Sequence, residues 1–357
     1  ATQERRSNVK VITGVGGWPA EIGEQARAAE AAGFDTITCG ELSHDSMLTM
    51  TVAATATERV GLQTSVTIAF PRSPMVLAME AWDIQHLSKG RFVLGLGSQV
   101  KGHNERRFGG TWSAPAPRMR EYIRMMHEVW DSWQDGKRPE FLGRHYTYTL
   151  MTPNFNPGPI DFPRPQVGLA MVGPGMARVA GDVADVVMPH GGIMSDKYMR
   201  EVLLPAVREG LVRSGRTWSD LEIAESGYLV VGDDDGEIER KIDGMRRALS
   251  FYGSTRTYHK VLALHGLEEL GMKLHALSLQ GKWQEMHDTV EPDHILELAD
   301  TCTWDQLPEF LATRREYATR TGLGIRRETP GQQERANEVL KRVQAVDNPG
   351  VPRGLEI

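Results

Sequence analysis

The sequence is poor in cysteine and has no long apolar run. Its 357 residues include two cysteines, Cys39 and Cys302, which are too few and too far apart for a disulfide framework or a cysteine metal site. No apolar stretch approaches the roughly 20 residues that cross a bilayer, and the polar residues 1–8 lack a signal-peptide core. We therefore expect reduced thiols and a soluble, cytoplasmic protein without membrane contact.

The chain also lacks a basic excess. It carries 41 Lys and Arg against 47 Asp and Glu, a formal net charge of −6, and its basic residues cluster only as isolated Arg pairs. Proteins that bind nucleic acids usually gather basic residues on one face. We expect a small-molecule substrate and no nucleic-acid partner.

Two common catalytic patterns are missing as well. Amidohydrolase-type barrels place a His-x-His pair after their first strand to hold a metal ion, and here Gly14-Val15-Gly16 occupies that place. The sequence has no Gly-x-Ser-x-Gly elbow to present a nucleophilic serine. We expect neither a metal site nor serine hydrolase chemistry.

What the chain does contain is an alternation of short β-branched runs with helical segments that begin at proline or a capping residue and end at glycine. The expected strands are residues 9–13, 36–39, 60–68, 92–96, 167–171, 186–188, 222–231 and 323–325. Eight strands separated by helices favour an α/β fold of the (β/α)₈ TIM barrel type over a doubly wound open sheet, which is the second choice.

Two segments interrupt this alternation. Residues 136–165, after the fourth strand, are rich in proline and aromatic residues, with a hairpin expected at 145–150, and residues 258–293, after the seventh strand, are expected to be mostly helical. We predict one barrel domain over residues 1–357 with these two insertions. Residues 303–306 match a capping box, which predicts a helix from there to about residue 319.

Polar residues and glycines gather after the predicted strands, where barrel enzymes carry their chemistry. Glu41 and His44 follow the second strand, and a carboxylate beside an imidazole can transfer protons near neutral pH, although a solvated loop has the same composition. Residues 173–176 follow the fifth strand and open a helix, whose free N–H groups suit a phosphate. The glycines of residues 95–98 suit a backbone that approaches a planar ring, or a tight turn.

These segments together resemble the luciferase-like monooxygenase superfamily, and most closely its branch of oxidoreductases that use the deazaflavin coenzyme F420. The resemblance extends from Val9 to about Ile325. It is carried by Gly33-Phe34-Asp35, Ser73-Pro74, the run Leu-Ser-Lys-Gly-Arg-Phe-Val-Leu-Gly-Leu-Gly at residues 87–97, Val172-Gly173-Pro174-Gly175-Met176 and Ala180-Gly181.

The resemblance implies a (β/α)₈ barrel that holds a flavin or deazaflavin at its C-terminal mouth. It implies a bulge with a non-prolyl cis peptide at residues 64–66, behind the ring, and Glu41 or His44 as the catalytic proton carrier. The cofactor-binding residues it implies are Gly14, Ser65, Val66, Ser98, Gly173, Pro174, Gly175 and Met176. Sugar-phosphate dehydrogenases of the family carry a glutamate where Val100 stands, so that substrate is not expected here.

The leading hypothesis is hydride transfer between coenzyme F420 and a small, fairly apolar organic substrate with a C=O, C=C or C=N bond. The aromatic residues and methionines of the two insertions indicate the apolar substrate. The alternative is an FMN-dependent monooxygenase that works with a flavin reductase, and a cofactor-binding protein without catalysis is the third. The resemblance also implies a homodimer, and either enzyme would draw reduced cofactor from an F420- or flavin-reductase.

Overall fold

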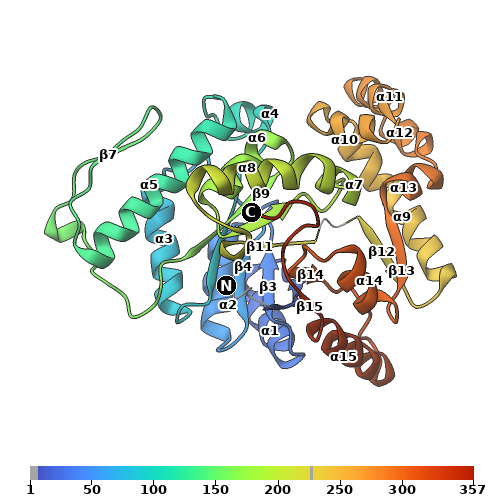
Figure 1. Cartoon of the computed structure of the whole chain (residues 1–357), viewed down its shortest axis with the longest axis horizontal. Coiled ribbons are helices and arrows are strands. Elements are labelled where there is room, and N and C mark those ends of the chain that lie inside the picture. The colour runs from blue at the N-terminus through green and yellow to red at the C-terminus, as the bar shows by residue number, and fades with distance from the viewer. Residues whose placement is uncertain (1–6, 226–227) are drawn as a thin grey trace.

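The centre of the protein is a parallel β-sheet that curves into a barrel (Figure 1). This computed structural model describes residues 7–225 and 228–357. Eight strands of the described chain follow one another around the barrel, and a parallel bridge between Ala224 and Arg320 joins the two ends of the sheet. In spatial order they are β11 (Glu222–Ile223), β10 (Val186–Pro189), β9 (Gln166–Met171), β6 (Phe92–Gly97), β4 (Gly61–Thr64), β3 (Thr36–Cys39), β2 (Lys10–Gly14) and β14 (Arg320–Gly322). The (β/α)₈ barrel is confirmed.

The helices that follow the first strands carry the start signals read from the sequence. α1 (Pro19–Ala31) and α3 (Pro74–Leu87) begin with proline, and Asp45 caps α2 (Ser46–Ala56) by accepting a 2.8 Å hydrogen bond from the Leu48 N–H. The other elements between β6 and β11, apart from the first insertion, are α4 (Lys101–Arg106), α5 (Pro115–Asp135), α6 (Pro174–Val183), α7 (Asp196–Tyr198), the π-helical turn η2 (Met199–Leu203), α8 (Leu204–Ser214) and the short η3 (Trp218–Asp220). No helix of the described residues combines the length and the apolar character needed to span a bilayer.

The third predicted strand is divided by a bulge. β4 ends at Thr64, and the chain pairs with β6 again only as β5 (Thr67–Ile68). Gln63 lies opposite Val93 and Thr67 opposite Leu96, so four steps along one strand face three along the other. The Ser65–Val66 peptide bond within the bulge is cis, at the segment that the resemblance implied.

Between β6 and β9 the chain leaves the barrel and forms an arm, residues 136–165, at the left of Figure 1. The arm contains the hairpin of β7 (Phe141–Leu142) and β8 (Thr147–Tyr148) and a 3₁₀ turn, η1 (Pro153–Phe155). The hairpin thus starts a few residues before the expected one.

Between β11 and β14 the chain builds a lobe, at the right of Figure 1. β12 (Leu229–Gly232) and β13 (Asp300–Thr303) pair there as a separate parallel sheet, against which α9 (Asp235–Gly253) packs. The remaining elements are η4 (Arg256–Tyr258), α10 (His259–Leu264), α11 (Glu268–Leu279), α12 (Trp283–Thr289) and α13 (Pro292–Leu298). The lobe therefore contains the helical segment 258–293 but is larger.

Three expectations about this region were wrong. The strand expected at 222–231 is two strands of different sheets, β11 and β12, and residues 226–227 lie outside the described residues. Residues 303 and 306 exchange the hydrogen bonds of the capping box, but they close a turn, and α14 (Leu307–Arg314) begins after it and ends earlier than expected. The last barrel strand is β14 and not residues 323–325, because its charged first residue, Arg320, is buried by pairing with Glu222 of the neighbouring strand β11.

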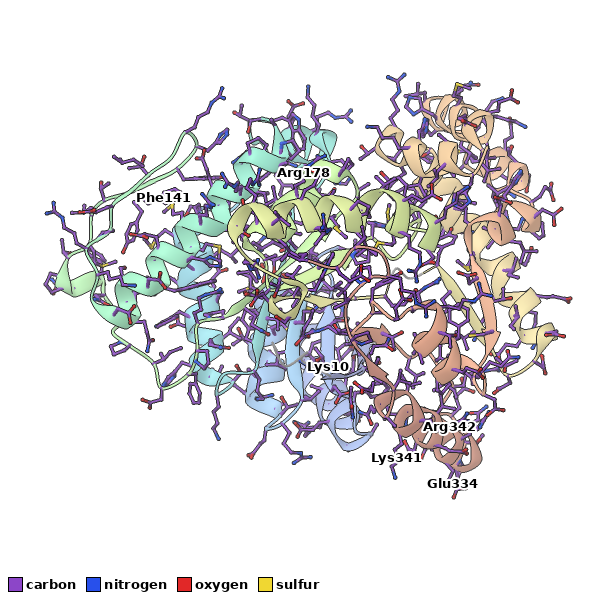
Figure 2. All side chains as sticks on the ribbon, in the orientation of Figure 1. Lys10, Phe141, Arg178, Glu334, Lys341 and Arg342 are labelled. Carbon is purple, nitrogen blue, oxygen red and sulfur yellow. The ribbon has the colours of Figure 1, made fainter. Side chains whose placement is uncertain are left out.

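The N-terminal ends of the strands, which we call the foot of the barrel, are tied by charges. Lys10 lies 2.6 Å from Glu222, which also pairs with Arg320, and the Arg320 guanidinium donates to the Gln63 amide oxygen. β1 (Ser7–Asn8) pairs with β15 (Asp347–Asn348) after α15 (Pro330–Gln344). Figure 2 shows Lys10 among the strands and Glu334, Lys341 and Arg342 on the outer side of α15.

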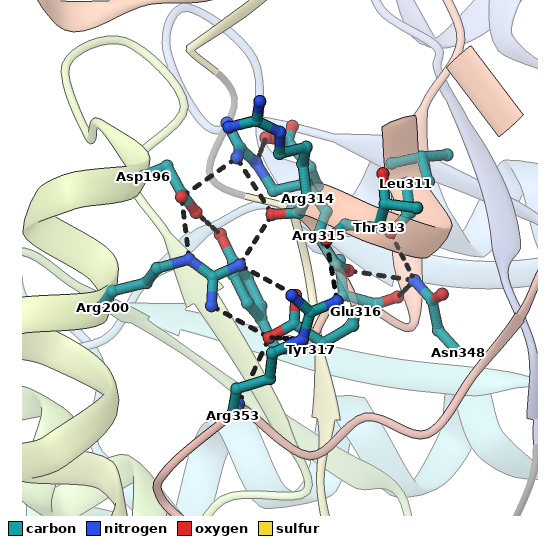
Figure 3. Close-up of polar contacts among 12 residues, drawn as sticks. Asp196, Arg200, Leu311, Thr313, Arg314, Arg315, Glu316, Tyr317, Asn348 and Arg353 are labelled. Carbon is teal, nitrogen blue, oxygen red and sulfur yellow. Dashed lines mark hydrogen bonds and ion pairs between the residues drawn. The ribbon is translucent and has the colours of Figure 1, made fainter. Parts of the chain in front are cut away.

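A buried arginine links the lobe to the barrel. Arg315, with a side chain only 1% exposed, forms ion pairs with Asp196 of α7 at 3.1 Å and with Asp300 of β13 at 2.6 Å. Beside it, Arg200 of η2 donates two hydrogen bonds of 2.9 Å to Glu316 (Figure 3). Removing one member of a buried ion pair leaves an uncompensated charge and strongly destabilises the protein. These ion pairs therefore hold the segment before β14 in place.

Candidate active site

The bulge forms a shelf of backbone, residues 64–66, at the C-terminal mouth of the barrel. The Ser65 N–H donates to the Cys39 carbonyl at 2.6 Å. The Thr64 hydroxyl replaces the lost ladder bonds: it accepts from the Gly95 N–H at 2.9 Å and donates to the Gly95 carbonyl at 2.8 Å. The Ser65 side chain is exposed, whereas the half-buried Val66 packs against the cluster of Val93, Val186 and Met188 inside the barrel.

Two glycines of β6 make room for this shelf. A Cβ atom at Gly95 would lie 1.8 Å from the Thr64 carbonyl oxygen, and one at Gly97 would lie 2.5 Å from the Val66 Cγ2 atom. Any side chain at either position would push the shelf away. From the sequence, the glycines of residues 95–98 suited either a tight turn or a backbone that approaches a planar ring. In the structure, glycine is required at these two positions because the shelf packs against them.

The loop after β6 places Ser98 at the mouth. The buried Asn104 side chain donates to the carbonyls of Ser98 at 2.9 Å and Val100 at 3.1 Å, and it thereby fixes the loop. Gly14, at the end of β2, is exposed, and a Cβ there would come no closer than 4.0 Å to the Thr38 carbonyl oxygen. Both predicted cofactor contacts therefore border open space.

The predicted anion site lies at the next strand of the sheet, because β6 pairs with β9. Gly173 is the N-cap of α6 and provides no capping side chain, and the Gly175 N–H lies in the first turn, where a helix offers no carbonyl partner. A Cβ at Gly173 would meet no atom within 4 Å. A free helix N-terminus in front of open space suits a phosphate, and Pro174 and Met176 belong to the same turn.

Glu41 is held tightly. Its side chain is 11% exposed, accepts a 2.6 Å hydrogen bond from the Ile68 N–H, and forms an ion pair through both oxygens with Arg72, which also binds Asp45. Although burial lowers it, the two carboxylates raise the pKa of Arg72 above its ordinary value. These contacts engage both carboxylate oxygens and make Glu41 an anchor between the loops after β3 and β5, and its predicted role as proton carrier stays a prediction.

His44 lies on the same loop with more freedom. Its half-buried ring meets Trp18 edge to face, with centroids 4.7 Å apart, and Trp18 is 67% exposed. The two rings come from the loops after β3 and β2, so they border the mouth together. The role of His44 as proton carrier stays a prediction.

Sequence reasoning assigned no role to two residues of the mouth. Arg72 follows β5 and neutralises Glu41, a pairing across 31 residues that no local pattern reveals. His190 follows β10, and the alternation Val186, Met188, His190 could have revealed it, since the first two face the barrel interior. The predicted site is otherwise brought together at the strand ends.

A cavity of about 570 Å³ lies away from this mouth. It lies between α3 and the arm, and its walls include Met79, Trp82, Trp133 and Phe155. Its lining is mostly apolar and contains no residue of the strand ends, so we place the chemistry at the mouth.

Comparison with known proteins identifies the family of the chain. A family model described as luciferase-like monooxygenase matches residues 7–321. An uncharacterized protein of Mycobacterium tuberculosis is 40% identical over 297 residues, 82% of this chain and 87% of the relative. The 5,10-methylenetetrahydromethanopterin reductase of Archaeoglobus fulgidus is 28% identical over 251 residues, 70% of each chain.

Among solved structures, the coenzyme F420-dependent tetrahydromethanopterin reductase from Methanopyrus kandleri superposes with a TM-score of 0.71 at 18% identity. The match covers 96% of this chain and 99% of the reductase. At this identity the likeness establishes the shared fold.

Proposed function

Because the chain belongs to the luciferase-like monooxygenase family, we propose that it is an oxidoreductase that transfers a hydride between coenzyme F420 and a small, fairly apolar organic substrate with a C=O, C=C or C=N bond. The observation that carries the proposal is the backbone shelf, residues 64–66, backed by Gly95 and Gly97 of β6, together with the free N-terminus of α6, which follows β9 on the other side of β6. A planar ring and a phosphate on one ligand match these two features.

The residues present fit such a cofactor. The shelf would support the ring, Gly14 and Ser98 would border its polar chain, and Gly173–Met176 would bind the phosphate. When bound, the deazaflavin supplies a ring carbon that gives or accepts the hydride. A relative in Mycobacterium tuberculosis named as a putative coenzyme F420-dependent oxidoreductase, 30% identical over 230 residues, adds support from sequence.

The remaining residues of the mouth would order the site and move the proton. Arg72 holds Glu41, so the loop after β3 keeps a fixed position beside the shelf. His44 is then the better placed of the two predicted proton carriers, because both oxygens of Glu41 are engaged. Trp18 beside it offers an apolar surface to the substrate.

The partners are proposals of the same kind. A homodimer and a reductase that supplies reduced cofactor would fit the proposed chemistry. A sedimentation profile at micromolar concentration tests the dimer, because a monomer there would remove it.

Two binding titrations test the cofactor, one with F420 and one with FMN, followed by fluorescence on purified apo-protein at the same salt and pH. We expect FMN to bind at least tenfold more weakly than F420, a difference of about 1.4 kcal/mol. The opposite order, with oxygen consumed in the presence of a flavin reductase, would replace the proposal by the FMN-dependent monooxygenase.

A further inference from the structure

We infer that His190 binds the oxygen atom of a substrate carbonyl group by donating a hydrogen bond from its Nε2 atom, with Tyr252 and Tyr258 as the wall beside it. The inference rests on the proposed function, because it assigns a substrate contact within the same mouth. Of the three proposed substrate bonds, C=O, C=C and C=N, it selects C=O, the one that contains an oxygen atom.

The position of His190 follows from the alternation of β10. Val186 and Met188 belong to a cluster inside the barrel together with Val93, and Val66 of the shelf packs against that cluster. Side chains two residues apart on a strand share a face, so His190 continues this row one level higher, at the mouth. Because His190 directly follows β10, its ring lies at the mouth, where Tyr252 and Tyr258 of the lobe contact it.

The hydrogen-bonding role of each ring nitrogen can be assigned. The Gly192 N–H donates to the Nδ1 atom of His190 at 3.1 Å, so Nδ1 carries a lone pair and the neutral ring carries its proton on Nε2. Within the described residues Nε2 has no hydrogen-bond partner, and it is not among their fully buried polar atoms. The ring thus presents a donor to whatever occupies the mouth.

The ring is held in this orientation by the lobe. Its centroid lies 4.8 Å from that of Tyr252 in α9 and 5.2 Å from that of Tyr258 in η4. A Cβ atom at Gly192 would lie 2.5 Å from the Tyr252 ring, so only glycine allows this packing. Burial lowers the pKa of His190, and the ring remains neutral at pH 7.

A second histidine shows what a structural role looks like in the same chain. The Nε2 atom of His265 lies 2.7 Å from the Ser195 hydroxyl and its Nδ1 atom 3.3 Å from the Glu297 carboxylate, so both nitrogens are engaged. His190 has one nitrogen engaged by backbone and the other free. That difference separates a ligand-binding imidazole from one that ties two elements together.

This contact would assist hydride transfer to the carbonyl carbon. The carbonyl carbon receives a hydride, with its electron pair, from the reduced deazaflavin, which is thereby oxidised, and the π electrons of the C=O bond move to the oxygen. The Nε2–H of His190 stabilises the charge that develops there, while a proton delivered by His44, which regains one from water at the open mouth, completes the alcohol. Because His190 gives a hydrogen bond and not its proton, it remains a neutral imidazole throughout.

The test compares His190→Ala, His190→Gln and the control His265→Gln in the full-length protein, with F420 affinity measured by fluorescence and reduction measured with acetone, cyclohexanone and acetophenone. We expect His190→Ala to lower kcat/KM by roughly 10²- to 10³-fold while F420 affinity changes less than twofold. The amide N–H of His190→Gln should restore at least a tenth of the lost activity, and thermal melts confirm that each variant folds.

Nitrogen NMR of the histidine rings gives a readout that does not depend on turnover, and we expect the Nε2–H tautomer for His190. The Nδ1–H tautomer, a loss of F420 affinity in His190→Ala, or wild-type protein that binds F420 and reduces none of the three ketones would each overturn the inference. Failure of wild-type protein to bind F420 would instead overturn the proposed function, and the tautomer of the apo-protein still decides the orientation of His190.

Discussion

The two ends of the barrel treat polar groups in opposite ways. At the foot, Glu222 pairs with Lys10 and Arg320, and Arg320 reaches on to Gln63. At the mouth, beside the ion pairs of Arg72 with Glu41 and Asp45, two donors have no partner in the described chain: the Gly175 N–H at the start of α6 and the Nε2–H of His190. Charges that satisfy one another stabilise a fold, whereas donors without partners are available to a ligand.

The glycines of the mouth also differ from one another in the free space around them. Gly95 and Gly97 are crowded by the shelf, while a Cβ at Gly173 would meet nothing. Glycine therefore serves packing on one side of the mouth and leaves access on the other. Four changes would break or sharpen this comparison, and they follow in order of expected effect.

The largest effect is expected at the foot. Arg320→Met should lower the free energy of unfolding by about 3–5 kcal/mol, because it leaves the mostly buried Glu222 with Lys10 alone. Urea titration measures this loss. The exposed Lys341→Met is the matched control and should change stability by less than about 0.5 kcal/mol. Equal losses in the two variants would show that the foot is not held by its charges.

At the mouth, Gly97→Ala should displace the shelf, since its new methyl group would lie 2.5 Å from Val66. We expect a loss of about 1–3 kcal/mol in stability and weaker F420 binding. Val66→Ala in the same chain removes the obstructing atom and should restore binding. If the double variant binds no better than Gly97→Ala, the shelf does not form part of the cofactor site.

The two ends should also respond to acid at different pH. Although burial raises it, Arg320 and Lys10 together lower the pKa of Glu222 below its ordinary 4.5, so its contribution is present above pH 4.5 and is lost as the pH falls through the folded value. Burial lowers the pKa of His190 below 6.5, so the unfolded chain takes up the proton first and stability is lost as the pH falls below 6.5.

Urea midpoints between pH 3 and pH 8 separate these contributions. Relative to wild-type protein, His190→Gln should flatten the profile just below pH 6.5, and Glu222→Gln only below pH 4.5. A change of the profile in the same window for both variants would contradict the separate environments.

The smallest change in stability is expected at Gly173, where stability and F420 affinity should change in opposite directions. Gly173→Asp supplies a cap and a negative charge to α6, which should stabilise the protein by about 0.3–1 kcal/mol. The same carboxylate would repel a bound phosphate and should weaken F420 binding at least tenfold. Lys282→Asp, at the uncapped start of α12 in the lobe, controls for added charge and should leave binding unchanged.

The sequence was most informative where one strand or one turn decides the outcome. Thr36–Cys39 was predicted to the residue because a short apolar run between a glycine turn and a polar loop is a complete signal. Because parallel strands end at the same side, the same reasoning brought Glu41, Ser98 and Gly173 to one mouth. The role of each side chain depended on partners that are distant in sequence.

Those partners explain the errors. Arg320 begins a strand although it is charged, because Glu222, 98 residues earlier, neutralises it. β13, with the sequence Asp-Thr-Cys-Thr, has no apolar pattern and is a strand because β12 lies beside it. His190 follows β10 directly, and only its contacts with Gly192, Tyr252 and Tyr258 distinguish it from an ordinary loop residue.

The seam between Ala224 and Arg320 has a consequence for how the chain folds. The lobe lies between these two residues, so the barrel closes across a loop of nearly a hundred residues. Chain entropy opposes such closure, by about 0.6 kcal/mol for each doubling of loop length. Pairing of β12 with β13 brings the two ends of that loop together beforehand. During synthesis the lobe leaves the ribosome before β14. Pairing of β12 with β13 can therefore shorten the loop that β14 must close when it joins the barrel.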